Sequence, residues 1–204
     1  MIETLHLASG KFYHIYNRGN NSENIFIEEK NYDYFLKLWG KHISPIADTY
    51  AYCMLKNHFH ALVKMKPFYD NSGNELNIQA EAKSPWQKGF SNFFNAYAKS
   101  INKAYERTGK LFEERFRRKE VSNNQYLLQL VYYIHANPQK HGFTDDFRGY
   151  PHSSYEHILN DNSTIVNTTE LLNWFDEKKL FEMYHSNLHL KLKNENSIVF
   201  HDVD

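Results

Sequence analysis

Two histidines lie one residue apart in the segment HFHALVKM, residues 58–65. Side chains alternate between the two faces of a β-strand, so His58 and His60 should share one face while Phe59 and Ala61 share the other. The apolar set should face the core. Both imidazoles are then expected on the open face, with Cβ atoms about 7 Å apart. Two imidazoles at that separation can bind one divalent ion.

The same pattern has simpler interpretations. An H-x-H pair taken alone is more often two exposed strand histidines. A third alternating histidine would give the pattern of the His-triad nucleotide hydrolases, but residue 62 is a leucine, which argues against that class. A metal site therefore needs support from another part of the chain.

A tyrosine and an amide lie one helical turn apart in the segment YLLQLVYYIHANP. Tyr133 and Asn137 are four residues apart, so on a helix they project within about 40° of each other, beside the apolar stripe. The adjacent Tyr132 lies about 140° from Asn137 and cannot share a site with it. A tyrosine in such a position usually packs or reaches toward solvent. What suggests a site is its coincidence with the two histidines, if this helix covers the sheet's open face.

A His, His, Asn and Tyr constellation is suited to phosphoryl transfer. A metal ion polarises a phosphate oxygen while the phenol attacks phosphorus, which gives a covalent phosphotyrosine. A phenol with a pKa near 10 is a poor nucleophile at neutral pH unless its proton is removed and the charge on phosphorus is offset. Mg²⁺ or Mn²⁺, completed by water and substrate oxygens, suits such a mixed ligand set better than a closed zinc site does.

The elements that must position these residues follow the order strand, helix, strand, strand, helix, strand. The predicted strands are GKFYHIYNR, ending near Arg18, then IADTYAYCML, HFHALVKM and FRRKEVS; the predicted helices begin near Glu28 and at Pro85. This order predicts an α+β, ferredoxin-like (RRM-like) antiparallel sheet with two helices on one face, leaving the other face for a ligand or another element.

Helix ends and loops are predicted from local signals. Ser84 should cap the helix that starts at Pro85, and Gly109 should stop it. Ser122 and Gln125 form a capping-box pattern for the tyrosine helix, which Pro138 should end. Residues 67–84 are polar and lack periodicity, which predicts a surface loop.

Composition indicates one globular unit with an appendage. The chain has 204 residues, 41% of them hydrophobic, with fifteen Tyr and fifteen Phe; aromatic residues this numerous mostly form core, and some can stack on bases. The single Cys53, a start without a leader pattern and the lack of an apolar run of about 18 residues predict a cytoplasmic protein with no membrane segment. We expect a catalytic domain over 1–144 and an acidic, mostly helical extension over 145–204, with its final dozen residues disordered.

Charge is unevenly distributed although the net charge is zero. Residues 145–204 carry 11 acidic and 5 basic side chains, so residues 1–144 carry the balancing positive charge. Basic residues concentrate between positions 97 and 119: Lys99, Lys103, Arg107, Lys110, Arg115, Arg117, Arg118 and Lys119. Such a run is often only a solvated face, but it also suits nucleic acid.

Five segments together resemble the single-tyrosine HUH transposases. They are YHIYNRGNNSENIF, CMLKNHFHALV, YAKSINKAYERTGKLFEERFRRKEV, YLLQLVYYIHANPQKHGF and YPHSSY, in this order over roughly residues 12–156. The likeness is to the insertion-sequence type and especially to relatives associated with repetitive extragenic palindromes. Insertion-sequence members usually have Gln where this chain has Asn137, which favours the repeat-associated branch.

The resemblance implies a ferredoxin-like fold and divalent-metal-dependent DNA transposition chemistry. Single-stranded DNA is cut and rejoined near a hairpin through a 5′-phosphotyrosine, with a free 3′-OH. It implies that His58, His60 and Asn137 hold Mg²⁺ or Mn²⁺ and that Tyr133 is the nucleophile. Family members occur as monomers and as homodimers, so the oligomeric state stays open.

The resemblance also favours the nucleic-acid interpretation of the charge. DNA carries one phosphate charge per roughly 1.7 Å of duplex axis, so basic side chains on the second helix and the RFRRK strand beside the site are expected to contact the backbone. The predicted DNA contacts are Arg18, Lys99, Lys103, Arg115, Arg117, Arg118, Lys119 and Lys140, with His141 as a further candidate. The acidic extension could tune affinity, pack against the site, or do neither.

Two other function classes remain open. The first is a domesticated protein that binds DNA hairpins without cutting them. The second is an RNA-binding sheet of similar topology, which would want aromatic residues on the open face of the third strand, where His58, His60 and Lys64 are expected instead.

Overall fold

The computed structural model describes residues 6–76, 78, 84–113 and 115–194. Its strands are β1 (Phe12–Arg18), β2 (Ala47–Leu55), β3 (His58–Met65) and β4 (Arg117–Val121). Its helices are α1 (Glu29–His42), α2 (Pro85–Ala104), α3 (Asn124–Lys140), α4 (Ser154–Leu159), α5 (Thr168–Asn173) and α6 (Lys178–Asn194), with 3₁₀ turns η1 (Asn20–Ser22) and η2 (Phe147–Gly149). The expected disorder at the C-terminus falls on residues that lie mostly outside the described ones. Within the described residues, no helix combines the length and the apolar character needed to cross a membrane.

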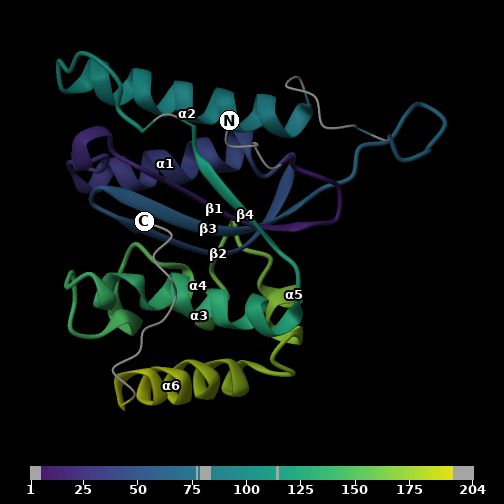
Figure 1. Ribbon diagram of the computed structural model, residues 1–204, viewed down its shortest axis with the longest axis vertical. Coiled ribbons are helices and arrows are strands. Elements are labelled where there is room, and N and C mark those ends of the chain that lie inside the picture. Colours follow the sequence, from purple (N-terminus) through teal and green to yellow (C-terminus); the bar gives the residue numbers. More distant parts are fainter. Residues whose placement is uncertain (1–5, 77, 79–83, 114, 195–204) are drawn as a thin grey trace.

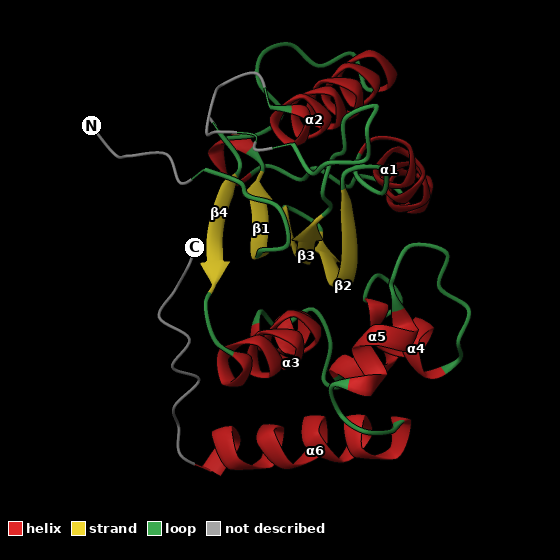
Figure 2. Cartoon of the chain, turned by 90° about the vertical axis from the view of Figure 1, so that its right-hand side faces the viewer, coloured by secondary structure: helices red, strands yellow, loops and turns green. Residues whose placement is uncertain are grey.

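The four strands form one antiparallel sheet in the order β2-β3-β1-β4. Helices α1 and α2 cover one face of the sheet, and α3 covers the other (Figure 1). Seen from the side, α6 lies beyond α3 as a further layer, with α4 and α5 next to it (Figure 2). The predicted ferredoxin-like α+β fold with a helix on its second face is confirmed.

Strand alternation divides the side chains of the sheet between these two layers. Tyr16 pairs with His60 across β1 and β3, and with Arg117 across β1 and β4. Because directly paired residues point to the same face, these three side chains lie on the α3 face. Ile15, paired with Ala61 and Arg118, marks the opposite face.

The layer between the sheet and the helices α1 and α2 is an aromatic core. Phe35 of α1 packs edge-to-face on Phe59 of β3, with ring centroids 5.0 Å apart, and on Phe93 of α2, at 4.8 Å. Trp39 packs in the same way on Phe93 at 5.2 Å. Burial of each such ring contributes about 1.5–3 kcal/mol, so this layer anchors β3 and fixes the face to which its histidines point.

The region after residue 144 packs onto the outer edge of β2 and onto α3. The backbone N–H of Met54 donates to the carbonyl of His152 at 2.9 Å, and that of Asn167 donates to the carbonyl of Thr49 at 2.8 Å. An open strand edge is thereby covered. On the other side, Tyr132 of α3 hydrogen-bonds His189 of α6 at 3.0 Å. The acidic region thus packs against the edge of β2 and against α3, whereas packing against the site itself stays a prediction.

Helix α2 begins as predicted but ends earlier. The Ser84 side chain accepts from the backbone N–H of Gln87, as expected for an N-cap. The helix ends at Ala104 rather than at Gly109, because Glu106 adopts a left-handed conformation (φ 50°) and the N–H of Arg107 donates to the carbonyl of Asn102. This closes the helix without glycine.

Both predicted ends of α3 are wrong by a few residues. The N-cap is Asn123, whose side chain accepts from the N–H of Tyr126 at 2.8 Å, not Ser122. Pro138 lies inside the last turn instead of ending the helix. The N–H of Phe143 donates to the carbonyl of Pro138 and Gly142 has φ 72°, a left-handed closure that stabilises the turn despite the proline.

Candidate functional site

The predicted residues of β3 and α3 meet between the sheet and α3. His58 and His60 are 8% and 0% exposed, and their rings lie 5.1 Å apart at 88°. The Tyr133 ring packs against that of His60, with centroids 5.7 Å apart at 77°. Asn137, one turn further along α3, is fully buried beside His58. The convergence expected from strand and helix periodicity is thus observed.

His58 is oriented by two amides. Its Nδ1 lies 2.7 Å from Oδ1 of Asn57, and its Nε2 lies 3.4 Å from Oδ1 of Asn137. An amide oxygen only accepts, so in the neutral tautomer with the proton on Nδ1, the atom with the shorter contact, Nδ1 donates to Asn57 and Nε2 keeps its lone pair. Nε2 of His58 and Oδ1 of Asn137 are then two acceptors that face each other, an arrangement that a shared cation stabilises.

His60 is paired with a histidine of β1 that no sequence motif marks as part of the site. Nδ1 of His60 lies 3.0 Å from Nε2 of His14 on β1, and both side chains are fully buried. For His60 to bind a metal through Nε2, its Nδ1 must carry the proton and donate to His14, as metal-binding histidines commonly donate to a second group. Alternation in FYHIYN places His14 and Tyr16 on one face, but only the strand register shows that His14 lies next to His60.

The ionisation of both histidines suits this arrangement. Burial, and then the positive charge of Lys119, lowers the pKa of His14 to about 3, so His14 stays neutral and can accept a hydrogen bond. Burial, followed by the charges of neighbouring basic side chains, holds the pKa of His60 well below its usual value. A metal ligand must be the neutral imidazole.

Two buried polar atoms of the site residues could bind a group from outside the chain. Nε2 of His60 and Nδ2 of Asn137 have no hydrogen-bond partner within the described part of the chain. Buried polar atoms are nearly always paired, and leaving one unpaired costs about 1–3 kcal/mol. A divalent cation accompanied by a phosphate would satisfy both atoms, because the imidazole offers a lone pair and the amide offers an N–H.

The described His, Cys, Asp and Glu side chains near the site are too few to hold a metal ion by themselves. Among residues 6–194, apart from those whose placement is not described, no group of three or more His, Cys, Asp and Glu side chains could hold a metal ion. His58, His60 and the Asn137 amide would therefore supply part of a coordination sphere, with oxygens of water and substrate completing it. These donors fit Mg²⁺ or Mn²⁺.

The last turn of α3 adds basic side chains to the site. Nζ of Lys140 lies 5.3 Å from the centroid of the Tyr133 ring, and the His141 ring lies 5.1 Å from that of His58. Lys140 and His141 reach these positions because α3 continues past Pro138 instead of ending there.

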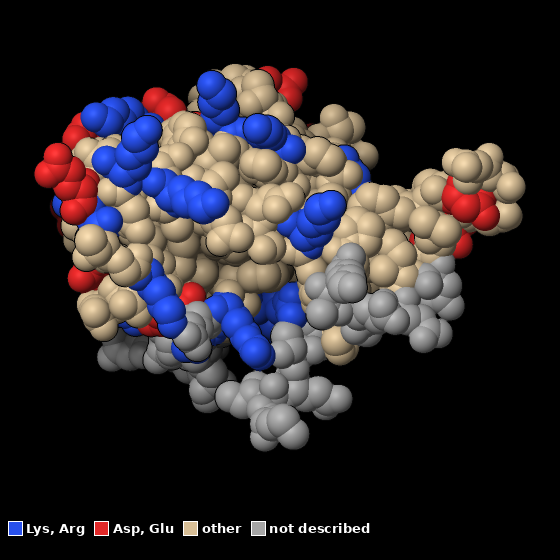
Figure 3. All heavy atoms as spheres, turned by 90° about the horizontal axis from the view of Figure 1, so that it is seen from above, with Lys and Arg blue, Asp and Glu red and all other residues tan. Residues whose placement is uncertain are grey.

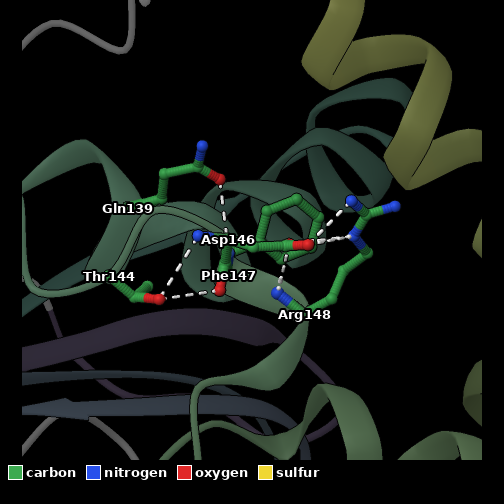
Figure 4. Close-up of polar contacts among 5 residues, drawn as sticks. All are labelled: Gln139, Thr144, Asp146, Phe147 and Arg148. Carbon is green, nitrogen blue, oxygen red and sulfur yellow. Dashed lines mark hydrogen bonds and ion pairs between the residues drawn. The ribbon is translucent and has the colours of Figure 1, made fainter.

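The connection after α3 ties this last turn to η2 (Figure 4). The side-chain oxygen of Gln139 accepts from the backbone N–H of Phe147 at 3.2 Å. The Asp146 carboxylate accepts from the backbone and from the guanidinium of Arg148, both at 2.8–3.0 Å. This bonding holds Gln139, and with it the neighbouring Lys140, at the edge of the site.

A cavity of about 480 Å³ opens next to the histidines. His58 and His60 line it together with Arg18 from the end of β1 and Arg117 from the start of β4. Arg18 donates to Ser22, and Arg117 lies 3.7 Å from Glu113. Positive charge therefore faces the cavity from two strands, and contact of these two residues with DNA stays a prediction.

The other predicted DNA contacts are divided between the two faces of the sheet. Lys119 lies on the α3 face, where its Nζ sits 5.1 Å from the ring centroid of Tyr126. Arg118 lies on the opposite face, over the Phe116 ring at 5.0 Å. The expectation that the whole RFRRK strand lies beside the site is wrong, because adjacent residues of a strand point to opposite faces.

The second helix is also not beside the site. Lys99 and Lys103 are on α2, across the sheet from α3, while Arg115 lines a cavity on that same side. Viewed from the α2 side, Lys and Arg side chains are dispersed over the face among uncharged ones (Figure 3). The predicted fold already placed this helix on the face opposite the tyrosine helix, so the expectation that its basic side chains lie beside the site is wrong.

Comparisons with known proteins identify a similar fold. No protein-family model and no curated protein matches this sequence. One similar solved structure is that of the REP-associated tyrosine transposase bound to a REP hairpin, with a TM-score of 0.54 and 16% sequence identity over 78% of this chain and 85% of that one. At this identity the likeness establishes a shared fold.

Proposed function

We propose that this chain cuts and rejoins single-stranded DNA next to a hairpin, with Tyr133 as the nucleophile. The observation that carries the proposal is the convergence of four side chains from β3 and α3, namely His58, His60, Tyr133 and Asn137, in one buried site beside a basic cavity. The fold shared with a tyrosine transposase bound to a hairpin supports it.

In the proposed reaction the phenol oxygen of Tyr133 attacks a DNA phosphorus. The bond from phosphorus to the 3′ oxygen breaks, the phenol loses its proton and the departing 3′ oxygen gains one, leaving a 5′-phosphotyrosine and a free 3′-OH. Rejoining is the reverse attack by a 3′-OH. Nζ of Lys140, over the Tyr133 ring, would offset negative charge that develops during the attack.

His58, His60 and Asn137 would hold Mg²⁺ or Mn²⁺. When bound, the ion offsets the charge that develops on the phosphate oxygens. Arg18 and Arg117, at the mouth of the cavity, would bind neighbouring phosphates and set the position of the strand.

The proposed partner is a hairpin formed by a palindromic repeat, with an unpaired segment that enters the site. Among the single-tyrosine HUH transposases that the sequence resembles, Asn137 in place of Gln favours the repeat-associated branch. The similar solved structure is described as bound to a REP hairpin.

The test is to trap the covalent product. Purified protein is incubated with labelled hairpin DNA carrying single-stranded flanks, with Mg²⁺, with Mn²⁺, or with a chelator. We expect a denaturation-resistant adduct with either metal and none with the chelator. Tyr133→Phe should abolish the adduct, whereas Tyr132→Phe, which changes the neighbouring tyrosine bonded to His189, should retain it. An adduct that persists in Tyr133→Phe would contradict the assignment.

A hairpin-binding protein without cleavage activity is the second candidate. It is favoured by the small number of strong metal ligands near the site within the described residues. Tight hairpin binding by wild-type protein with no adduct under either metal would support it.

A further inference from the structure

A second cavity, of about 750 Å³, lies on the α2 side of the sheet and has no part in the reaction proposed above. Its walls include Phe94 of α2, Phe116 and Arg118 at the start of β4, and the amide side chains of Asn17 and Gln87. Aromatic rings, a guanidinium and amides are the side chains that bind unpaired nucleotides in other single-strand-binding sites.

The two cavities adjoin at one end of the sheet. Asn17 and Glu113 line both of them. At this end Gly19 bridges to Phe112, and the N–H of Glu113 donates to the carbonyl of Arg18, so residues 111–113 continue alongside the end of β1. The two cavities therefore share part of their lining at this end of the sheet.

Gly19 makes the tight turn after β1 sterically possible. A Cβ at this position would lie 1.9 Å from the backbone oxygen of Glu23, far inside van der Waals contact. The turn after β1 is therefore closely packed at Gly19.

Strand alternation places one arginine side chain in the lining of each cavity. Arg117 lines the first cavity and Arg118 the second, because adjacent β4 residues point to opposite faces. Arg118 is partly buried over Phe116, and no carboxylate of the described residues forms an ion pair with it. Burial, and then the like charge of Arg115, lowers the pKa of Arg118, so an anion placed beside it would be stabilising.

The aromatic floor of the second cavity is already assembled. The Phe116 ring stacks on Phe90 and Phe94 with centroids 4.7 and 5.3 Å apart and interplanar angles of 28° and 25°. The guanidinium of Arg118 covers Phe116 and offers its own plane for stacking. Phe94 and Phe116 are only partly buried, so a flat ligand can reach them from the cavity.

We propose that this α2-side cavity binds one unpaired nucleotide of the DNA strand whose neighbouring segment occupies the Tyr133 site. The base stacks on the platform formed by Phe94, Phe116 and Arg118, and Arg118 also attracts its phosphate. The inference rests on the proposed function and adds to it a subsite that reads single-stranded flank on the far side of the sheet. A base paired in duplex cannot reach this platform, which makes the subsite selective for unpaired DNA.

The experiment compares the affinity of wild-type protein for a hairpin alone with its affinity for the same hairpin carrying a short single-stranded flank. Stacking of one base is expected to improve affinity for the flanked hairpin by roughly 5- to 100-fold. Arg118→Gln and Ser91→Trp, which fills the cavity from an exposed position on α2, should remove most of this gain and leave affinity for the hairpin alone unchanged. Lys88→Gln, an exposed charge change on the same helix outside the cavity, is the matched control and should keep the gain.

A second measurement locates the base directly. A flank carrying 5-iodouracil should crosslink on irradiation to a peptide containing Phe94 or Phe116, and Ser91→Trp should suppress that crosslink. A gain that persists in both variants, or a wild-type protein that gains nothing from the flank, would overturn the subsite while hairpin binding stands. Failure of the wild-type protein to bind the hairpin at all would instead overturn the proposed function.

Discussion

The two faces of the central sheet are both buried but carry different chemistry. Between the sheet and α1/α2 the contacts are mainly aromatic, as in the packing of Phe35 on Phe59 and Phe93. On the α3 side lie all the buried histidines of the described residues: His14, His58, His60, His135 and His185. The α3 side thus holds the polar side chains on which the proposed reaction depends, whereas the α1/α2 side is mainly an apolar core.

The largest predicted effects come from substituting two adjacent residues of β3 that point to opposite faces of the sheet. His60→Ala should reduce metal-dependent cleavage more than about 100-fold, beyond the usual effect of losing an outer partner of a metal ligand. Phe59→Ala should lower the free energy of unfolding by about 3–5 kcal/mol through the cavity it leaves in the aromatic core. Cleavage assays and denaturant titrations on both variants check this. Equal destabilisation by the two substitutions would contradict the proposed division of roles.

A second prediction concerns the contribution of the α3 side to acid stability. His185 donates from Nδ1 to the carbonyl of Phe181 and pairs through Nε2 with Nδ1 of His135, which in turn contacts Ser154. Burial lowers the pKa of His185 to about 4. Between pH 6.5 and about 4 the unfolded chain binds a proton at this residue and the folded chain does not, so the free energy of unfolding falls as the pH falls.

The slope from this residue is at most about 1.4 kcal/mol per pH unit. Urea titrations across that range should show a steep loss of stability for the wild type and a shallower one for His185→Leu. If His185→Leu leaves the pH dependence of the free energy of unfolding unchanged, His185 is not the residue that causes the loss of stability in acid.

The third prediction addresses His14, which we interpret as a positioning residue. His14→Leu removes the acceptor for Nδ1 of His60 and should weaken Mn²⁺ binding about 10- to 100-fold. His14→Gln offers an amide oxygen and should restore part of the affinity. Calorimetric titration of the protein with Mn²⁺ alone measures this without DNA or turnover. Identical affinities for the Leu and Gln variants would remove the hydrogen bond as the explanation.

The layers also differ in how well sequence predicts them. The meeting of His58, His60, Tyr133 and Asn137 was predictable because strand and helix periods are fixed by backbone geometry. The His14 contact was not, because it depends on the register of β1 against β3. Alternation applied to β4 would have separated Arg117 from Arg118. The face covered by α2 follows from the order of strands and helices, which would have removed Lys99 and Lys103 from the predicted contacts beside the site.

The smallest predicted effect compares the caps of the helices on the two faces. On the α2 side Ser84 was a correct prediction, whereas on the α3 side Ser122 and Asn123 are adjacent residues that are both good N-caps, and local pattern alone chose the wrong one. Asn123→Ala should lower the free energy of unfolding by about 1 kcal/mol, because the N–H of Tyr126 loses its acceptor. Ser122→Ala should change it by less than about 0.5 kcal/mol, as for other surface substitutions. Thermal unfolding of the two variants checks this. A larger loss in Ser122→Ala would mean that α3 begins one residue earlier in solution, which would restore the capping box inferred from sequence.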